Sequence, residues 1–140
     1  MERIGTVEEA FEVFMKVPEL DQYLSIEEMR KKVTAGSLVL VSERQNSLIG
    51  FKIGYPLSET EFYSWLGGVV PSKRKIGAAK RLLLLQEQLV KERSFKHIKV
   101  KSMNRFRSML KMLISNGYDI TEVENYGHDE AERICFKKVL

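Results

Sequence analysis

The hydrophobic positions of this chain recur with two different periods, which separate helices from strands. Near the beginning, two capping boxes of the form Ser/Thr-x-x-Glu stand at residues 6–9 and 25–28, where each side chain can satisfy a free backbone donor of a helix start. The apolar residues after the first box predict a helix over about 7–16, and the second box predicts a helix that ends at Gly36. The segment before Thr6 offers at most a stub of a strand, so the chain is expected to open with a helical pair.

The middle of the chain changes to a period of two, which is typical of strands. Residues 37–41 predict one strand, and 45–47 predict the turn into a second, where four apolar residues alternate with glycine and lysine: Ile49, Phe51, Ile53 and Tyr55 with Gly50, Lys52 and Gly54. Residues 62–70 predict a third strand, which Pro71 closes. Together these strands form a meander.

Helical spacing returns over residues 74–93, where a broad leucine-rich face indicates packing against a sheet. Asn104 is expected to cap a further helix that Asn116 and Gly117 end. Further strands are predicted at 97–101, 118–123 and 133–140. The sequence therefore predicts an α+β fold in one domain, residues 1–140, with helices layered on a central, mostly antiparallel mixed sheet.

Composition narrows the class of protein. The 140 residues are 44% hydrophobic, enough for a sizeable core, and the single cysteine, Cys135, excludes an internal disulfide framework. No Cys/His spacing typical of a metal site occurs, so no metal is expected. The N-terminal segment is acidic, so it does not predict a signal peptide. The longest aliphatic run, residues 82–85, is too short to predict a membrane span. A cytoplasmic protein without membrane attachment is expected. The net charge of +4 suits an anionic partner.

The most informative segment is the junction at residues 66–80, where a strand passes through a short basic loop into a helix. A helix start points free backbone N–H groups and a partial positive charge at one spot. Three consecutive cations at 73–75 add full charges, and the small residues at 77–79 allow an anion to approach the backbone. A diphosphate fits this arrangement, although neither the P-loop pattern nor the dinucleotide fingerprint is present.

This order of features resembles the GNAT superfamily of N-acetyltransferases. The run Arg74-Lys-Ile-Gly77-Ala-Ala79 is similar to the family signature R/Q-x-x-G-x-G/A, and Val69-Val70-Pro71 resembles the Val-x-Pro that precedes it. Further on, Asn104 and Asn116-Gly117-Tyr118 resemble the family's Asn at the head of the next helix and its closing Gly-Phe. The resemblance covers residues 37–140, and the opening helices are compatible with the family's variable acceptor-side helices.

The resemblance implies a binding site for acetyl-CoA. Backbone N–H groups from Lys75 to Ala79 would hold the pyrophosphate, and the segment from Gly67 to Val69 would pair with the pantetheine arm where the sheet opens. Asn104 would also contact the pantetheine. The residues expected to bind the cosubstrate are Gly68, Val69, Val70, Arg74, Lys75, Ile76, Gly77, Ala78, Ala79 and Asn104.

By the same resemblance, the Gly67 N–H would lie near the thioester carbonyl and stabilise the charge that develops there. The acceptor amine must lose its proton before attack, because a primary amine with a pKa of about 10.4 is almost fully charged at neutral pH. Strict alternation places Glu61, Tyr63 and Trp65 on the face of Gly67. Glu61 or Tyr63 is therefore the expected base, and Trp65 is either a core residue or a wall of the acceptor pocket.

The family's tyrosine that protonates the leaving thiolate is missing. Counting back from Gly117, its place is taken by Leu113, and counting forward from Asn104 it is Lys111. Tyr118, Tyr126 or a water molecule could take over this role.

These observations predict an N-acetyltransferase in which an amine of a small molecule or peptide attacks the thioester directly. Two alternatives remain: a GNAT-fold module that binds acyl-CoA without turnover, and a basic nucleic-acid-binding domain. The second rests on cations at 96–101 and 105–107, which are also what one charged face of a strand or helix presents, so no nucleic-acid partner is expected. Arg105, Arg107 or Lys111 could instead meet the 3′-phosphate of CoA. The sequence is compatible with a homodimer and does not identify the acceptor.

Overall fold

The computed structural model describes residues 1–20, 22–125, 127 and 132–140. Within these residues the helical elements are α1 (Val7–Phe14), the short 3-10 helix η1 (Pro18–Leu20), α2 (Ile26–Lys32), a second 3-10 helix η2 (Pro71–Lys73), α3 (Ala78–Glu92) and α4 (Arg107–Ser115). The strands are β1 (Glu2–Ile4), β2 (Leu38–Arg44), β3 (Ser47–Pro56), β4 (Glu61–Val69), β5 (His97–Ser102), β6 (Asp119–Glu124) and β7 (Arg133–Val139). They form one seven-stranded sheet in the order β1-β2-β3-β4-β5-β7-β6.

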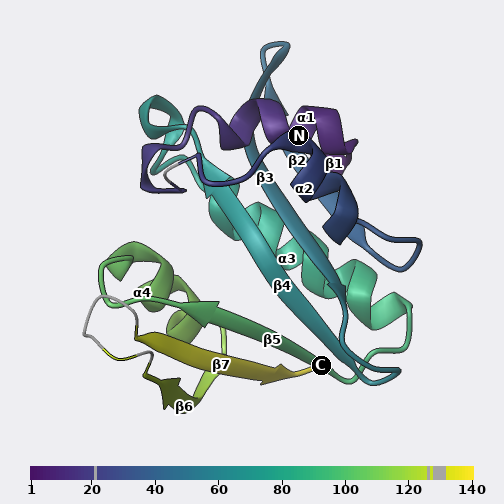
Figure 1. The fold of residues 1–140 in the computed structure, drawn as a ribbon, viewed down its shortest axis with the longest axis vertical. Coiled ribbons are helices and arrows are strands. Elements are labelled where there is room, and N and C mark those ends of the chain that lie inside the picture. The colour runs from purple at the N-terminus through teal and green to yellow at the C-terminus, as the bar shows by residue number, and fades with distance from the viewer. Residues whose placement is uncertain (21, 126, 128–131) are drawn as a thin grey trace.

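The sheet is mixed and is covered on both faces. All neighbouring strands pair antiparallel except β4 and β5, which are parallel. Helices α1 and α2 lie on one face of β2–β4, and α3 crosses the opposite face (Figure 1). The predicted α+β architecture, with helices layered on a mostly antiparallel mixed sheet, is therefore confirmed.

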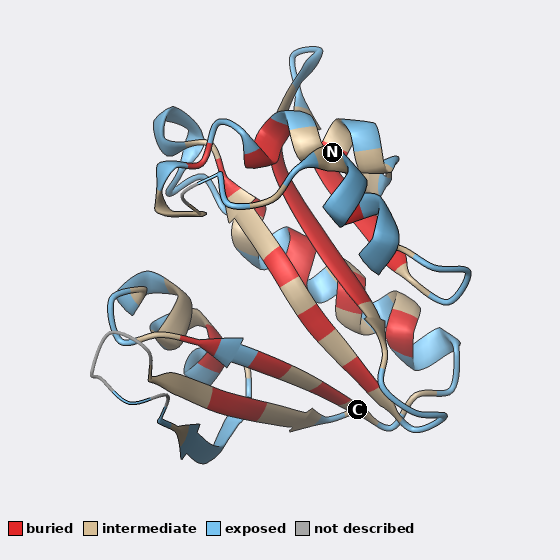
Figure 2. Cartoon of the chain, viewed as in Figure 1, coloured by how far each residue is buried: buried red, intermediate tan, exposed pale blue. Residues whose placement is uncertain are grey.

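Two main clusters of buried side chains correspond to these two faces. The α3 cluster joins Leu40 and Phe62 of the sheet to Leu82 of α3 and Leu113 of α4. The α1 cluster packs α1 and Met29 of α2 onto the other face of β2–β4. Figure 2 shows the consequence: the central strand β3 is buried along most of its length. None of the helices in the described part of the chain has the length and apolarity needed to cross a bilayer.

Local sequence signals place most of the element boundaries. Both capping boxes form: Thr6 accepts a hydrogen bond from the backbone of Glu9, and Ser25 does the same for Glu28. The β2–β3 hairpin turns at Gln45 and Asn46, which both have positive φ angles. The predicted meander β2-β3-β4 is confirmed.

Four boundaries differ from the sequence prediction. The stub before Thr6 is a true edge strand, because β1 pairs with β2 over three residues. Helix α2 ends at Lys32 rather than Gly36, since Val33 takes an extended conformation. Helix α3 starts at Ala78 rather than residue 74, because Lys75 and Gly77 have left-handed backbones that no helix accommodates. Helix α4 begins after Phe106 without a side-chain cap, so the expectation that Asn104 caps it is wrong.

A bulge in β4 changes which residues share a face. Leu66 pairs with Ile53 and Ser64 pairs with the next residue, Gly54, so that Trp65 has no partner of its own on β3. A bulge of this kind reverses the in-and-out alternation of the residues on either side of it. Before Trp65 the even-numbered residues of β4 face α3, and after it the odd-numbered residues do.

Gly67 consequently faces α3, whereas Tyr63 faces the α1 side. Gly67 is the cross-strand partner of Lys52, which in turn pairs with Leu40 of the α3 cluster. Tyr63 instead packs against Tyr55, with ring centroids 5.5 Å apart. This corrects the face that strict alternation predicted for Glu61, Tyr63 and Trp65.

The sheet opens between β4 and β5. The two strands pair only from Glu61 with His97 to Ser64 with Val100, although β4 continues to Val69. Figure 1 shows the strands diverging from this short paired region. The expected opening of the sheet beside 67–69 is therefore present, and it leaves the outer edge of β4 without a strand neighbour there.

Candidate functional site

The gap between β4 and β5 forms a groove of about 1200 Å³. Its walls come from the end of β4, the loop and first turn of α3, the end of β5, and α4. The segment after α1, together with η1 and including Val17, Glu19 and Leu20, closes it on the face of the sheet that carries α1. The groove therefore joins the exposed edge of β4 to the start of α3.

The start of α3 is shaped to present backbone donors to this groove. Lys75 and Gly77 have φ angles of 66° and 88°, which turn the chain sharply before the helix. In the described part of the chain the N–H groups from Lys75 to Lys80 donate to no backbone carbonyl, as expected for a helix start. Arg81 steadies the turn, because its Nη1 donates to the carbonyl of Ile76 at 2.8 Å.

Arg74 braces the loop. Its Nε donates to the Val69 carbonyl at 3.0 Å, and its Nη1 lies 2.5 Å from Oε2 of Glu19. The hydrogen bond from Arg74 lowers the pKa of the Glu19 carboxyl. The guanidinium thus ties the end of β4 to η1 across the mouth of the groove.

Cations surround the groove. They come from the loop and first turn of α3, from β5 and its loop to α4, and from β7: Lys73, Arg74, Lys75, Lys80, Lys101, Arg105, Arg107 and Arg133. Of the three residues suggested for a 3′-phosphate, Arg105 and Arg107 line the groove, whereas Lys111 does not. The only acid among the lining residues described is Glu19, which is already paired with Arg74. The groove is therefore suited to a highly anionic ligand.

Most residues expected to bind the cosubstrate line this groove. They are Gly68, Val69, Arg74, Lys75, Gly77, Ala78 and Ala79. Three others do not: Val70, Ile76 and Asn104 are absent from the lining. Ile76 is 37% exposed, and Asn104 is also exposed. The loop therefore presents its backbone rather than every side chain to the groove.

The structure does not bring all three expected catalytic residues to the groove. Gly67 and Tyr63 line the groove, but Glu61 does not. The Glu61 carboxylate lies 3.2 Å from Nζ of Lys99 and 3.4 Å from Nζ of Lys137. The hydrogen bond from Lys99, followed by that from Lys137, lowers the pKa of Glu61. These ion pairs do not favour a proton-accepting role for Glu61.

An aromatic cluster stands at the end of the groove beside α2. Trp65 lines the groove and also packs on the α1 cluster, so it is part of the core and of the groove wall. Tyr55 lies behind it, with ring centroids 6.2 Å apart, and Nζ of Lys32 lies over both rings. Tyr63 and Tyr23 complete this end, and burial raises the pKa of both phenols.

None of the described substitutes for the missing tyrosine reaches the groove. Tyr118 is 3% exposed, and its hydroxyl donates to Oε2 of Glu87 at 2.8 Å. Burial and the neighbouring Glu87 hold the pKa of Tyr118 well above its usual value. Leu113 is buried in the core and Lys111 is exposed. Tyr126 lies outside the described residues.

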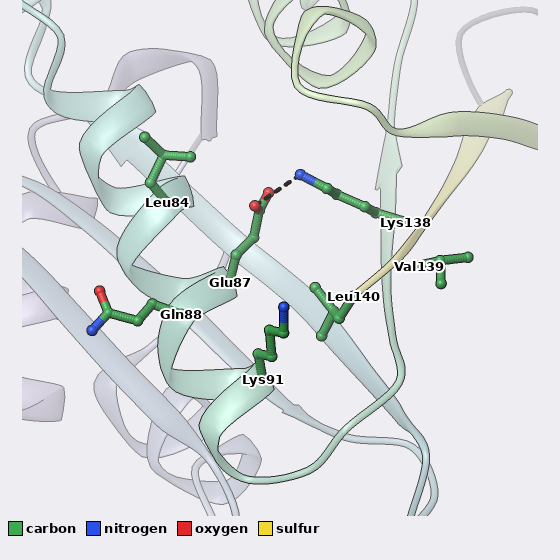
Figure 3. A pocket seen from close by; sticks show the side chains of 7 residues that line it. All are labelled: Leu84, Glu87, Gln88, Lys91, Lys138, Val139 and Leu140. Atoms are coloured by element: carbon green, nitrogen blue, oxygen red, sulfur yellow. Dashed lines mark hydrogen bonds and ion pairs between the residues drawn. The ribbon is translucent and has the colours of Figure 1, made fainter.

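Glu87 belongs to a second, smaller cavity of about 340 Å³ between α3 and the end of β7. Figure 3 shows the Glu87 carboxylate pointing to Lys138, whose Nζ donates to Oε1 at 2.9 Å. Together with Tyr118, Lys138 satisfies both oxygens of this carboxylate. Leu84 and Leu140 line the cavity beside this ion pair.

Two features were missed by the sequence analysis. Lys52 lines the groove although it is only 6% exposed, and no motif marks it. Glu122, Glu124 and Cys135 bring possible metal ligands within 4.8 Å of one another, because strand pairing unites them. Lys101 lies 2.9 Å from the Glu124 carboxylate, so ion pairing already compensates part of this acidic charge.

Comparison with solved structures identifies the fold. Ard1 from Thermoplasma volcanium is 17% identical, with a TM-score of 0.86 over 100% of this chain and 97% of that one. A GNAT family acetyltransferase from Elizabethkingia anophelis with acetyl-CoA bound is 15% identical, with a TM-score of 0.81 over 100% and 97%. The aminoglycoside 6'-N-acetyltransferase from Enterococcus faecium is 16% identical, with a TM-score of 0.81 over 99% and 96%.

No family model matches the sequence, and no curated protein matches it either. The similarity is therefore one of structure. This chain has the GNAT acyltransferase fold.

Proposed function

We propose that this chain, which has the GNAT acyltransferase fold, transfers the acetyl group of acetyl-CoA to an amine by direct attack, without a covalent enzyme intermediate. The observation that carries the proposal is the groove itself. It connects the open edge of β4 to the free N–H groups at the start of α3, with cations on both sides. The similar structure from Elizabethkingia anophelis has acetyl-CoA bound, which supports this choice of ligand.

The pyrophosphate would lie at the start of α3. The backbone N–H groups from Lys75 to Ala79 have no backbone acceptor within the described residues, and all of these residues except Ile76 line this end of the groove. The helix dipole adds a favourable partial charge. Lys73, Lys75 and Lys80 add positive charge around them. Arg74 would act mainly by holding the loop in place, since Glu19 and the Val69 carbonyl already engage its guanidinium.

The pantetheine arm would pair with the open edge of β4 from Gly67 to Val69. It would take the place that β5 occupies beside Glu61 to Ser64. The Gly67 N–H would then stabilise the oxyanion of the tetrahedral intermediate. One such donor contributes about 2.7–4 kcal/mol in well-studied enzymes. Holding amine and thioester together in one groove would supply much of the remaining rate enhancement.

The acceptor amine would approach from the aromatic end, beside Tyr63 and Trp65. Burial raises the pKa of Tyr63, so its phenol is protonated at neutral pH. It is therefore suited to orient the amine or a water molecule that removes the amine's proton, rather than to remove the proton as a phenolate.

The charge of the groove bears on the class of acceptor. Among the described lining residues Glu19 is the only acid, and Arg74 neutralises it. A polyamine or other polycation would find no free carboxylate in that set to pair with its additional charges. The acceptor that fits best is therefore a small molecule or peptide with a single reactive amine.

A second candidate function is acyl-CoA binding without turnover. The observation in its favour is that the usual acid tyrosine is replaced, and that Tyr118 is buried against Glu87. Such a module would share the groove and the phosphate site, and would differ only in releasing no thiol.

Thermal denaturation followed by an assay of thiol release separates these functions. Acetyl-CoA and CoA are expected to raise the melting temperature, since a ligand that binds only the native state stabilises it, and at least one singly charged amine is expected to elicit thiol release. Stabilisation without thiol release from a broad amine panel would favour the binding module. The same denaturation with an oligonucleotide tests the alternative of a nucleic-acid-binding domain. Stabilisation by the oligonucleotide alone, with steep salt dependence, would overturn both acetyl-CoA functions.

A further inference from the structure

Lys52 is a buried cation in the middle of the sheet. It stands on β3 between Leu40 of β2 and Gly67 of β4, and it is only 6% exposed. Figure 2 shows this part of β3 as buried. Leu40 belongs to the cluster that packs against α3, so Lys52 lies on that apolar face. A buried charge is costly here unless it is paired and hydrogen-bonded.

The side chain of Lys52 has an open path to the groove. Its cross-strand partner Gly67 carries no side chain, and a Cβ added there would lie 3.4 Å from Cγ of Lys52. The lysine stem therefore runs over the glycine. Neighbouring strands are about 4.8 Å apart, a distance that the four-carbon stem of lysine spans. Lys52 and Gly67 both line the groove between β4 and β5.

The charge of Lys52 has little compensation from its neighbours. In the described residues no hydrogen bond or ion pair of Lys52 is present. Its sheet neighbours on this face, Leu40, Gly67 and Ser64, carry no charge. From α3, Glu87 acts on it electrostatically, but that carboxylate is held by Tyr118 and by Lys138 of β7 (Figure 3). Burial consequently lowers the pKa of Lys52 to about 8.

We propose that the ammonium group of Lys52 meets the sulfur of the bound thioester and donates its proton to the departing CoA thiolate. This inference rests on the proposed acetyl transfer, which places the thioester beside Gly67. It assigns to Lys52 the role for which this fold's usual tyrosine is missing. A cation that lines the groove beside Gly67 and has no hydrogen bond or ion pair in the described residues is suited to that step.

The step balances. The neutral amine attacks the carbonyl carbon and forms the C–N bond, and the C–S bond breaks with its electron pair moving to sulfur. Lys52 gives its proton to sulfur, which yields free CoA thiol. The acceptor nitrogen loses one proton, and that proton restores the ammonium of Lys52 through water. Because a thiol has a pKa of about 8.5, the lysine and the leaving group hold the proton with similar affinity.

The pKa of the bound CoA thiol tests the proposal without an acceptor. It is measured from the ultraviolet absorbance of the thiolate as a function of pH, for CoA bound to the wild type, to Lys52→Met and to Lys91→Met. Lys91 is an exposed lysine of α3 that lines the other cavity, so it controls for the loss of one positive charge. The wild type and Lys91→Met are expected to lower the thiol pKa below that of free CoA. In Lys52→Met it should rise by roughly one unit, a tenfold change in proton affinity.

Lys52→Arg keeps the charge and cannot readily give up a proton. It is expected to keep the lowered thiol pKa and to lose the lysine-dependent limb of the pH–rate profile once an acceptor is known. If Lys52→Met does not fold, the same thiol titration with Lys52→Gln replaces it, because glutamine removes the charge and keeps a polar side chain of similar length. In that titration Lys52→Gln should raise the thiol pKa.

The outcomes that overturn the proposal differ from those that overturn the function. Equal thiol pKa values in the wild type and Lys52→Met, with CoA bound to both, would remove the role of Lys52 alone. Acetylation of Lys52 itself by acetyl-CoA, seen as a mass gain that Lys52→Arg abolishes, would make it an acceptor and also overturn the proposed role. Failure of CoA to bind the wild type would instead contradict the proposed function.

Discussion

Arg74 and Glu19 form an ion pair across the mouth of the groove, with Nη1 of the arginine 2.5 Å from Oε2 of the glutamate. The same guanidinium donates through Nε to the Val69 carbonyl at 3.0 Å. One side chain of the loop before α3 therefore contacts both the end of β4 and η1, which is distant in sequence. The backbone donors of that loop depend on this brace for their position.

Breaking the brace from either side should weaken acetyl-CoA binding. Arg74→Lys removes the forked contact and Glu19→Gln removes the opposite charge, and each is expected to reduce the affinity roughly threefold, as suits a half-exposed ion pair. Isothermal titration calorimetry with acetyl-CoA measures the effect. The control is Arg30→Lys, which alters the exposed ion pair of Arg30 with Glu8 on the opening helices. Tighter binding by Glu19→Gln would contradict the brace, because it would mean that Glu19 withholds Arg74 from the phosphates.

Gly77 provides a second test of the same loop. Its φ angle is 88°, and a Cβ there would come 2.7 Å from Nη1 of Arg81. Gly77→Ala should destabilise the fold by about 1–2 kcal/mol, the cost of a left-handed alanine. It should also weaken acetyl-CoA binding severalfold, since Arg81 must release the Ile76 carbonyl.

The matched control for this substitution is Gly117→Ala. Gly117 has the same φ of 88°, but a Cβ there meets only the end of Lys138, at 3.6 Å, and the residue does not line the groove. It should lose similar stability and keep its affinity for acetyl-CoA. Equal losses of affinity in both variants would show that general destabilisation, and not the loop, is responsible.

Local signals explain why so much of the fold could be predicted. The capping boxes and the closing glycine of α4 act within a few residues, so the sequence reveals them directly. The basic loop and its small residues likewise lie in one continuous segment. Seven of the ten expected binding residues line the groove, and five of these seven belong to that segment.

The remaining features depend on contacts between distant segments. Alternation along β3 separates Lys52 from its apolar neighbours, but it does not show that α3 covers the second face and buries the lysine. The bulge at Trp65 arises from register with β3, and it moves Gly67 to the face opposite Tyr63. No local signal in either strand records that change.

Tyr63 is expected to act in the transfer step rather than in binding acetyl-CoA. Tyr63→Phe should lower kcat by about tenfold to a hundredfold, less than the loss of a residue that transfers the proton itself, because the phenol only orients the amine or the water. The affinity for acetyl-CoA should stay unchanged. Steady-state kinetics with any amine identified in the thiol-release assay measures this. Tyr55→Phe is the control, since Tyr55 packs against Tyr63 without lining the groove. An unchanged kcat in Tyr63→Phe would remove the tyrosine from the reaction.

Lys52 should reduce the stability of the fold at neutral pH. Its pKa falls from 10.5 to about 8 on burial, so the folded state binds a proton less readily than the unfolded state. The cost is complete below pH 8 and is relieved as the pH rises from about 8 to about 10.5. At pH 7, Lys52→Met should therefore be more stable than the wild type by up to about 3 kcal/mol.

Urea denaturation from pH 7 to pH 10.5 measures this effect. The stability difference between Lys52→Met and the wild type should shrink across the range, whereas Lys91→Met should show no such trend. A stability difference that does not change with pH would mean that the pKa of Lys52 is not lowered in the folded protein.

Amide hydrogen exchange with and without acetyl-CoA tests the central claim most directly. If the thioester and pantetheine occupy the open edge of β4 and the pyrophosphate lies at the start of α3, acetyl-CoA should slow exchange in two segments, residues 65–69 and 75–80. CoA should protect the same segments, and the exposed face of β6 should be unaffected. Binding that protects neither segment, or protects only residues outside the groove, would contradict the account.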